Sequence, residues 1–269
     1  MSDMVELAPF DRSMLDAVAD FSLRISAPIS WHEPDTPWPR TLRGGTCFFL
    51  RFADNIVGVT ANHVIEIFEA ATVKTPGLIC QLRLTPFNPG EAIIDRDPGS
   101  DIATFRCSEE LLTLANTIAV DCRADWPPPI PERMRALSVC GFPEQMRKTN
   151  HKREVEFAAW GALAAVEDIT DRNILITYDP KIVRPSRWAP AMPPVGLNLS
   201  GCSGGPVLMH GERNGLFRWF PVALVIAGPR PEMKEGEAQE FDMIHLRRIH
   251  MIRPDGGIVR NESGWLPRA

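Results

Sequence analysis

The 269-residue sequence lacks three features, and each absence excludes a class of protein. Its longest apolar stretch, Phe220–Ala227, is far shorter than the roughly 18–20 residues that a membrane-spanning helix needs. Basic residues are not in excess, since 29 Lys and Arg stand against 34 Asp and Glu, so the charge pattern of a nucleic-acid-binding protein is missing. Residues 1–8 contain no positive charge and lead into no apolar segment, which argues against a secretory signal. We therefore expect a cytoplasmic protein with no nucleic-acid or membrane partner.

The cysteines and histidines also lack the spacings of a metal site. There is no C-x-x-C pair, and no two of the six cysteines lie within a dozen residues of each other. Five histidines form no ligand-spaced cluster: His32, His151, His210, His245 and His250. We expect no metal and no cofactor, and six reduced, mostly buried thiols in a chain long enough to fold without disulfides.

The first 40 residues differ in character from the rest of the chain. From Asp11 to Ser26 the apolar residues have the spacing of one helical face, which predicts an amphipathic helix. Four prolines then follow between Pro28 and Pro39, and they argue against helix or central strand until about residue 40. Residues 1–40 are therefore expected to form a helical extension and a proline-rich linker.

After Arg43 the sequence consists of short apolar runs separated by turn residues, a pattern typical of an all-β barrel or sandwich. The proline run Trp126–Pro131 divides it, which predicts one domain over 41–122, a second over 132–253 and a polar tail over 254–269. A further proline-rich stretch, Pro180–Pro194, is expected to be a long surface loop. The expected strands are Thr46–Phe52, Ile56–Ala61, Ile79–Leu84, Ile102–Phe105, Ala136–Val139, Val155–Trp160, Ile174–Tyr178, Pro206–Leu208 and Val222–Ile226.

Three short stretches contain residue types suited to nucleophilic catalysis. His63 follows a predicted strand in Val59-Thr-Ala-Asn-His63, and Asp101 stands at the start of the strand Ile102–Phe105. Ser203 lies in the glycine-rich stretch Gly201-Cys-Ser-Gly-Gly-Pro206. A serine hydroxyl is a poor nucleophile until a histidine takes its proton, and a carboxylate can orient that histidine. Each stretch alone is weak, because a single histidine or a turn aspartate is more often structural.

The order and spacing of the three stretches resemble the signatures of the trypsin-like (chymotrypsin-fold) serine peptidases, of an intracellular prokaryotic type. The resemblance extends from about Gly44 to Leu246 and implies two six-stranded antiparallel β-barrels after the N-terminal amphipathic helix. It also implies that Ser203 is the nucleophile, His63 the general base and Asp101 its orienting partner. The backbone N–H groups of Gly201 and Ser203 would form the oxyanion hole. The implied activity is that of a serine endopeptidase that makes limited cuts in a specific protein.

Two positions depart from the digestive members of this family. Cys202 precedes the nucleophile where those enzymes have an aspartate, which argues against activation by insertion of a new N-terminus and leaves a regulatory protein partner open. Cys202 is itself expected to be a buried structural thiol. By the resemblance, Leu197 lies at the base of the specificity pocket, so a basic residue is not expected before the scissile bond. Val225, Ile226 and Ala227 would pair with an extended substrate, Gly228 would line the pocket entrance, and Pro180–Pro194 would border it.

Other interpretations use the same residues. Asp95 and Asp97 are alternative partners for His63, although neither precedes an apolar strand as Asp101 does. Gly201–Gly205 also matches the nucleophile elbow of an esterase, but Pro206 and a β-type run follow it instead of a helix. The alternative from another class is a catalytically silent module that binds extended peptides without cutting them. In either case a protein or peptide is the expected partner.

Overall fold

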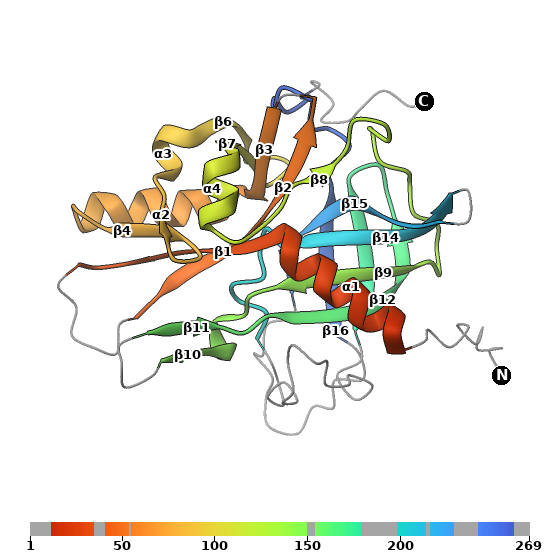
Figure 1. Ribbon diagram of the computed structural model, residues 1–269, viewed down its shortest axis with the longest axis horizontal. Helices are drawn as coiled ribbons and strands as arrows, with labels where there is room; N and C mark the ends of the chain where they lie inside the picture. Colours follow the sequence, from red (N-terminus) through yellow and green to blue (C-terminus); the bar gives the residue numbers. More distant parts are fainter. Residues whose placement is uncertain are drawn as a thin grey trace.

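The computed structural model describes residues 12–34, 41–53, 55–149, 154–178, 198–213, 216–228 and 242–260. These residues form a mostly β protein with an eight-stranded sheet in its first half and a closed six-stranded barrel in its second half (Figure 1). The expected all-β fold is confirmed in the coarser form of a mostly β fold, which also contains helices. Two buried apolar clusters fill the protein, one around Phe48 and Phe105 and the other around Leu137 and Leu246. The first cluster also includes Leu208 and Leu224 of the second half, so it crosses the junction between the halves.

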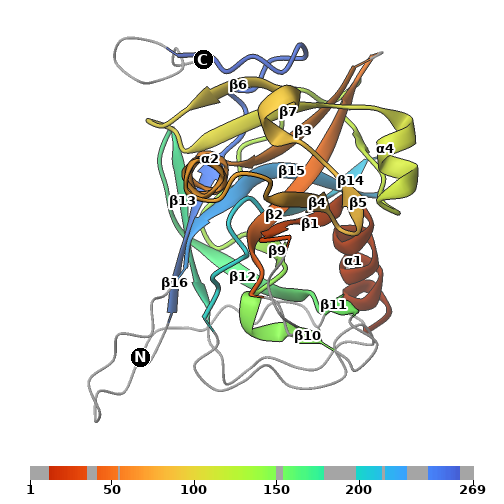
Figure 2. The same cartoon turned by 90° about the vertical axis from the view of Figure 1, so that its left-hand side faces the viewer.

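The sheet of the first half is built from residues 26–121. Its strand order is β5-β4-β1-β2-β3-β7-β6, with β8 pairing in parallel to β2. The helices attached to it are α2 (Asn62–Lys74), α3 (Pro89–Ala92) and α4 (Glu109–Leu114), and Figure 2 views α2 along its axis. The strands are β1 (Ser26–His32), β2 (Arg43–Phe52), β3 (Asn55–Ala61), β4 (Ile79–Leu82), β5 (Thr85–Pro86), β6 (Ile93–Asp97), β7 (Ile102–Cys107) and β8 (Val120–Asp121).

The barrel of the second half is closed by six antiparallel ladders in the order β12-β13-β16-β15-β14-β9. A short 3-10 helix, η1 (Glu144–Met146), leads into the separate hairpin of β10 (Arg147–Thr149) and β11 (Val155–Phe157). The barrel strands are β9 (Ala136–Gly141), β12 (Trp160–Ile169), β13 (Asn173–Tyr178), β14 (Pro206–Arg213), β15 (Leu216–Ala227) and β16 (Asp242–Arg248).

The same strand order occurs in both halves, although the sequence shows no repeat. The order β4-β1-β2-β3-β7-β6 in the sheet corresponds, strand by strand along the chain, to β14-β9-β12-β13-β16-β15 in the barrel. In the barrel, β14 and β15 pair and close the circle. In the sheet, the two-residue β5 extends beyond β4, α3 precedes β6, and no ladder among the described residues joins the two edges. The expected pair of closed barrels is therefore represented by one barrel and one open sheet.

The strand β1 corrects the expectation that no central strand precedes residue 40. All of β1 is buried, and it pairs with β2 on one side and β4 on the other. Pro28 has no N–H to donate. It is tolerated because the hydrogen-bonded ladder between β1 and β4 starts at the next residue, Ile29, so the missing N–H lies at the end of that ladder. The Pro28 carbonyl still accepts a hydrogen bond from the Arg83 N–H at 2.8 Å.

The helix α1 (Arg12–Ile25) precedes β1 and crosses the front of the molecule in Figure 1. The Phe21 ring stacks on Trp219 of β15, with ring centroids 4.8 Å apart. The Arg24 carbonyl accepts hydrogen bonds from the Ile118 N–H and the Thr117 hydroxyl of the first half. The helix therefore contacts both halves of the protein.

Residues 254–260 are not the polar tail that the sequence suggested. Ile258 is buried and forms an isolated β-bridge with Ile252. A Cβ added to Gly256, whose φ is +87°, would lie 2.6 Å from the Ile94 side chain, so this turn packs directly on β6. Residues 261–269 lie outside the described ranges.

The six cysteines are free, and five of them are buried, as expected. Burial raises the pKa of the Cys80, Cys107 and Cys122 thiols to about 12. Among the helices that the structure describes, none combines the length and the apolar character that crossing a bilayer requires.

Candidate functional site

His63 and Asp101 lie together at the same end of two neighbouring strands. Ala61, the last residue of β3, pairs with Ile102, the first residue of β7. His63 is the second residue of α2, directly after β3, and Asp101 directly precedes β7. His63 Nδ1 lies 2.8 Å from Asp101 Oδ2, and the His63 backbone N–H donates to Asp101 Oδ1 at 2.9 Å. Residues 38 positions apart are thus joined by two hydrogen bonds.

Asp101 also satisfies the start of α2, which has no side-chain cap of its own. The Asn62 N–H donates to the Asp101 carbonyl at 3.2 Å, and the His63 N–H donates to its carboxylate. These N–H groups have no partner inside the helix, and a negative charge near them is favourable. This arrangement follows from the sequence, because β3 leads directly into α2 and position 61 is an alanine, which cannot cap the helix with its side chain as Ser, Thr, Asp or Asn would.

The contact with Asp101 determines the tautomer of His63. A carboxylate oxygen can only accept a hydrogen bond, so Nδ1 carries the proton and Nε2 is left as the acceptor. The two side chains are 35% and 23% exposed, which leaves the imidazole accessible to a substrate. Asp101 has a φ of +56°, a conformation that aspartate tolerates better than most residues and that its neighbours must hold in place.

The two alternative partners of His63 are occupied elsewhere. Asp95 binds Arg260 through both carboxylate oxygens. Asp97 accepts hydrogen bonds from the N–H groups of Gly99 and Ser100. Neither contacts His63, so only Asp101 fits the role of its partner.

The loop Gly201–Gly205 lies against the end of β3. Gly204 has a φ of +85°, and a Cβ there would lie 2.1 Å from the Thr46 carbonyl oxygen and 2.9 Å from the Ala61 nitrogen. Only glycine fits so close an approach at a left-handed φ. Because Ala61 is two residues before His63, this contact brings the chain around Ser203 next to the histidine.

Thr46 of β2, which the sequence analysis did not single out, connects this loop to the first half. Its hydroxyl donates to the Gly201 carbonyl at 2.7 Å and accepts from the Phe142 N–H at 3.1 Å. Its N–H donates to the Ser203 carbonyl at 2.8 Å, and its carbonyl accepts from the Thr60 hydroxyl at 2.7 Å. Thr46 is fully buried. The glycine pair before it was the one available signal of a close backbone approach.

The backbone of the loop leaves two N–H groups available. The Ser200 carbonyl accepts from the Glu144 N–H at 2.8 Å, and the Cys202 carbonyl accepts from the Gly205 N–H at 2.8 Å. In a trans peptide the C=O and N–H point in opposite directions, so the N–H groups of Gly201 and Ser203 point away from these contacts. Neither has a hydrogen-bond partner among the described residues. Two such donors could stabilise a developing oxyanion.

Within the described ranges, no hydrogen bond joins Ser203 to His63. Hydrogen bonds between catalytic groups are often long in proteins without substrate and tighten only in the reacting complex. Comparison with models of protein families and with curated protein sequences finds no match.

Cys202 is fully buried, as expected for a structural thiol. Burial raises its pKa well above the usual range, which disfavours the thiolate that a cysteine nucleophile requires. Cys202 belongs to the buried apolar cluster of the barrel, and a Cβ added to Gly141 of β9 would lie 2.7 Å from its Sγ.

The residues expected to bind substrate have different outcomes. Leu197 and the loop Pro180–Pro194 lie outside the described residues. The expectation that the Val225 backbone binds substrate is wrong, because both of its groups already have partners in the protein. Its N–H donates to the Gly205 carbonyl at 3.0 Å, and its carbonyl accepts from the Gly204 N–H at 2.8 Å.

Beyond Val225, β15 has a free side. The ladder between β14 and β15 ends at Leu224, so Ile226, Ala227 and Gly228 have no strand neighbour there among the described residues. Gly228 approaches Leu199 so closely that a Cβ would lie 2.9 Å from the Leu199 Cβ.

No other chemistry stands out in the part of the chain that the structure describes. Its His, Cys, Asp and Glu residues include no group of three that could hold a metal ion. Two cavities of about 530 and 280 Å³ lie elsewhere, the first beside α2 and the second between α1 and β15, and neither is lined by His63, Asp101 or Ser203.

Proposed function

We propose that the protein is a serine endopeptidase with Ser203, His63 and Asp101 as its catalytic triad. The observation that carries the proposal is the meeting of three distant segments at one point. The His63–Asp101 pair stands at the end of β3, and the loop that contains Ser203 packs against the same end through Gly204. A glycine-rich loop with two N–H groups that have no other partner, next to a histidine–aspartate pair, provides the groups that acyl transfer requires.

The proposed reaction proceeds in two stages. Ser203 Oγ attacks the carbonyl carbon of the scissile bond while its proton moves to His63 Nε2. The negative charge on the carbonyl oxygen is stabilised by the N–H groups of Gly201 and Ser203. His63 then gives the proton to the departing amine, which leaves an acyl-enzyme. In the second stage His63 deprotonates a water that attacks the acyl carbonyl carbon, and it then returns the proton to Ser203 Oγ as the bond between Oγ and the acyl group breaks and the carboxylic acid leaves. Asp101 keeps the imidazole in the required tautomer throughout.

The strand order of the two halves supports the double-barrel architecture of the trypsin-like peptidases. The six strands β4-β1-β2-β3-β7-β6 repeat the order of the closed barrel. In this proposal the first half is a second barrel of the same design, opened between β4 and β6. His63 and Asp101 come from one half and Ser203 from the other, so the site lies at their junction.

An extended segment of a protein or peptide is the proposed substrate. It would add as a strand to the free side of Ile226–Gly228, where main-chain bonds provide affinity and side-chain pockets provide selectivity. The absence of an aspartate at position 202 removes the ion pair used by secreted zymogens, so we propose that the buried Cys202 and its neighbours hold the loop in its active form without a cleavage event.

Labelling with a fluorescent fluorophosphonate tests the proposal, because the probe reacts with an activated serine and needs no known substrate. We expect the wild-type protein to label and Ser203→Ala and His63→Ala to remain dark. Asp101→Asn should label about 10⁴-fold more slowly, the usual cost of the wrong histidine tautomer. Ser200→Ala is the matched control, since Ser200 is an exposed serine in the same loop and its removal should leave labelling unchanged.

The missing hydrogen bond between Ser203 and His63 favours a second candidate, a silent module that binds extended peptides. Wild-type protein that stays dark while it binds a peptide would establish this alternative. Labelling that persists in Ser203→Ala would contradict both the assignment of the nucleophile and the proposed mechanism.

A further inference from the structure

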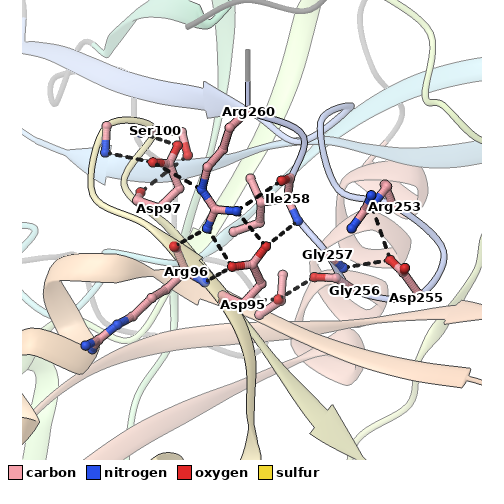
Figure 3. A network of polar contacts seen from close by, with 12 residues as sticks. Asp95, Arg96, Asp97, Ser100, Arg253, Asp255, Gly256, Gly257, Ile258 and Arg260 are labelled. Atoms are coloured by element: carbon pink, nitrogen blue, oxygen red, sulfur yellow. Dashed lines mark hydrogen bonds and ion pairs between the residues drawn. The ribbon is translucent and has the colours of Figure 1, made fainter. Parts of the chain in front are cut away.

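The C-terminal segment Arg253–Arg260 is attached to the hairpin that carries Asp101 (Figure 3). The segment is a compact turn, in which the Arg253 N–H donates to the Gly257 carbonyl and the Gly256 N–H to the Arg253 carbonyl, both at 2.8 Å. The hydroxyl of Thr104, in β7, donates to the Gly256 carbonyl at 2.6 Å. The turn therefore contacts β7 three residues after Asp101.

Arg260 binds β6 through its whole guanidinium group. Nη1 and Nη2 donate to the two carboxylate oxygens of Asp95 at 2.9 and 2.5 Å, and Nη2 also donates to the Arg96 carbonyl. Nε lies 3.8 Å from Asp97 Oδ1. The Ile258 N–H adds a bond to Asp95 Oδ2 at 2.8 Å. A planar group that holds two oxygens and a third partner at once fixes direction as well as distance.

Asp95 stays charged in this contact. Burial alone would raise its pKa, but the hydrogen bonds from Arg260, Ile258 and the Arg96 N–H outweigh it and lower the pKa. The hydrogen bond to Asp95 likewise raises the pKa of Arg260. The pair therefore remains ionised over the pH range in which a histidine acts as a base.

Asp97 connects this contact to Asp101. Its Oδ1 accepts from the Gly99 N–H at 3.2 Å, and its Oδ2 accepts from the Ser100 N–H at 3.0 Å. These bonds shape the turn between β6 and β7, which ends at Asp101 with its φ of +56°. A residue in that conformation keeps its place only when the surrounding turn is held from several sides.

We propose that Arg260 is a positioning residue for Asp101: by clamping Asp95 and the Asp97 turn, it holds the Asp101 carboxylate against His63 Nδ1. The expected effect on reaction rate rests on the proposed peptidase function. The expected effect on the hydrogen bond between His63 and Asp101 does not, so the two proposals can fail separately.

The test compares Arg260→Ala and Arg260→Lys with a matched control, Arg96→Ala. Arg96 lies on the same hairpin, pairs with Glu69 and has a side chain 42% exposed, against 46% for Arg260, but it points away from Asp95 (Figure 3). Lysine keeps the positive charge of Arg260 and cannot bind two oxygens in one plane. All variants are first compared with wild type by circular dichroism and thermal unfolding.

The first readout is the proton NMR resonance of His63 Nδ1–H, which a carboxylate partner moves far downfield and protects from exchange with water. It is assigned by its loss in His63→Ala. We expect Arg260→Ala to lose the resonance through faster exchange, Arg260→Lys to retain it only partly, and Arg96→Ala to keep it. The second readout is the rate of fluorophosphonate labelling, which should fall about 10- to 100-fold in Arg260→Ala, the range expected when a distant change misplaces a reacting group.

A folded Arg260→Ala that keeps both the resonance and the wild-type labelling rate would overturn the proposal. If Arg260→Ala does not fold, Arg260→Lys decides the matter by the same two readouts. Wild-type protein that never labels would end the peptidase proposal, and the resonance would still decide whether Arg260 positions Asp101.

Discussion

Replacement of Thr46 by valine tests whether one buried hydroxyl joins the loop Gly201–Gly205 to the first half. Valine has nearly the shape of threonine, so the substitution leaves no cavity and removes only the hydroxyl. Two buried backbone groups lose their partner, namely the carbonyl of Gly201 and the N–H of Phe142. An unpaired buried group costs about 1–3 kcal/mol, so with two such groups we expect the free energy of unfolding to fall by about 2–6 kcal/mol.

Thr46→Ser is the matched control for this prediction. It keeps the hydroxyl and removes one buried methyl group, which costs about 1 kcal/mol. Urea unfolding followed by tryptophan fluorescence measures both variants, and the fluorophosphonate labelling rate should fall in the valine variant alone. A valine variant at least as stable as the serine variant would refute the reasoning, because the hydroxyl would then contribute nothing to the junction.

Two further substitutions test other parts of the fold. Gly204→Ala should lower the free energy of unfolding by about 3 kcal/mol or more, because the new Cβ would lie 2.1 Å from a carbonyl oxygen of β2. The control is Gly77→Ala, which should cost only about 1 kcal/mol, because Gly77 has a similar φ of +87° but nothing lies within 4 Å of its Cβ position. Equal losses of stability in urea unfolding would contradict the close approach at Gly204. Burial, and then the nearby Arg135 charge, lower the pKa of His210 to about 4 in the folded protein. Between pH about 6.5 and about 4, His210 is therefore neutral in the folded protein and protonated in the unfolded chain. Stability should therefore fall as pH drops from about 6.5 to about 4, by about 2 kcal/mol at pH 5, and His210→Gln should remove that part of the pH dependence; an unchanged dependence would show that His210 does not cause it.

The contact between His63 and Asp101 was easier to predict than the residues that support the site. His63 and Asp101 each adjoin a short apolar run, and the ends of paired strands are where two such residues can meet. Ser203 stands among glycines that mark a tight loop. Thr46 and Arg260 carry no comparable signal, because each acts through partners more than 90 positions away in the chain, such as Gly201 and Asp95.

The strands that the sequence analysis missed have physical reasons of their own. β1 contains Pro28, which has no N–H, and the strand tolerates it only because the ladder between β1 and β4 ends next to it. β16 is rich in charged residues, and its signal is the alternation of Ile244 and Leu246, both buried, with more exposed neighbours. Such a strand contains no continuous apolar run, although it forms two ladders of the closed barrel.

The position of the loop between the two halves affects how the site would respond to substitution. Gly201 and Ser203 are bonded to Thr46 in the first half, while Gly204 and Gly205 are bonded to Val225 in the second. The distance from Ser203 to His63 therefore depends on how the two halves sit against each other. A substitution at this junction can separate the two side chains while both cores stay intact. We therefore expect variants here to lose more reactivity than their loss of stability alone explains, whereas a substitution inside one core should act mainly through stability.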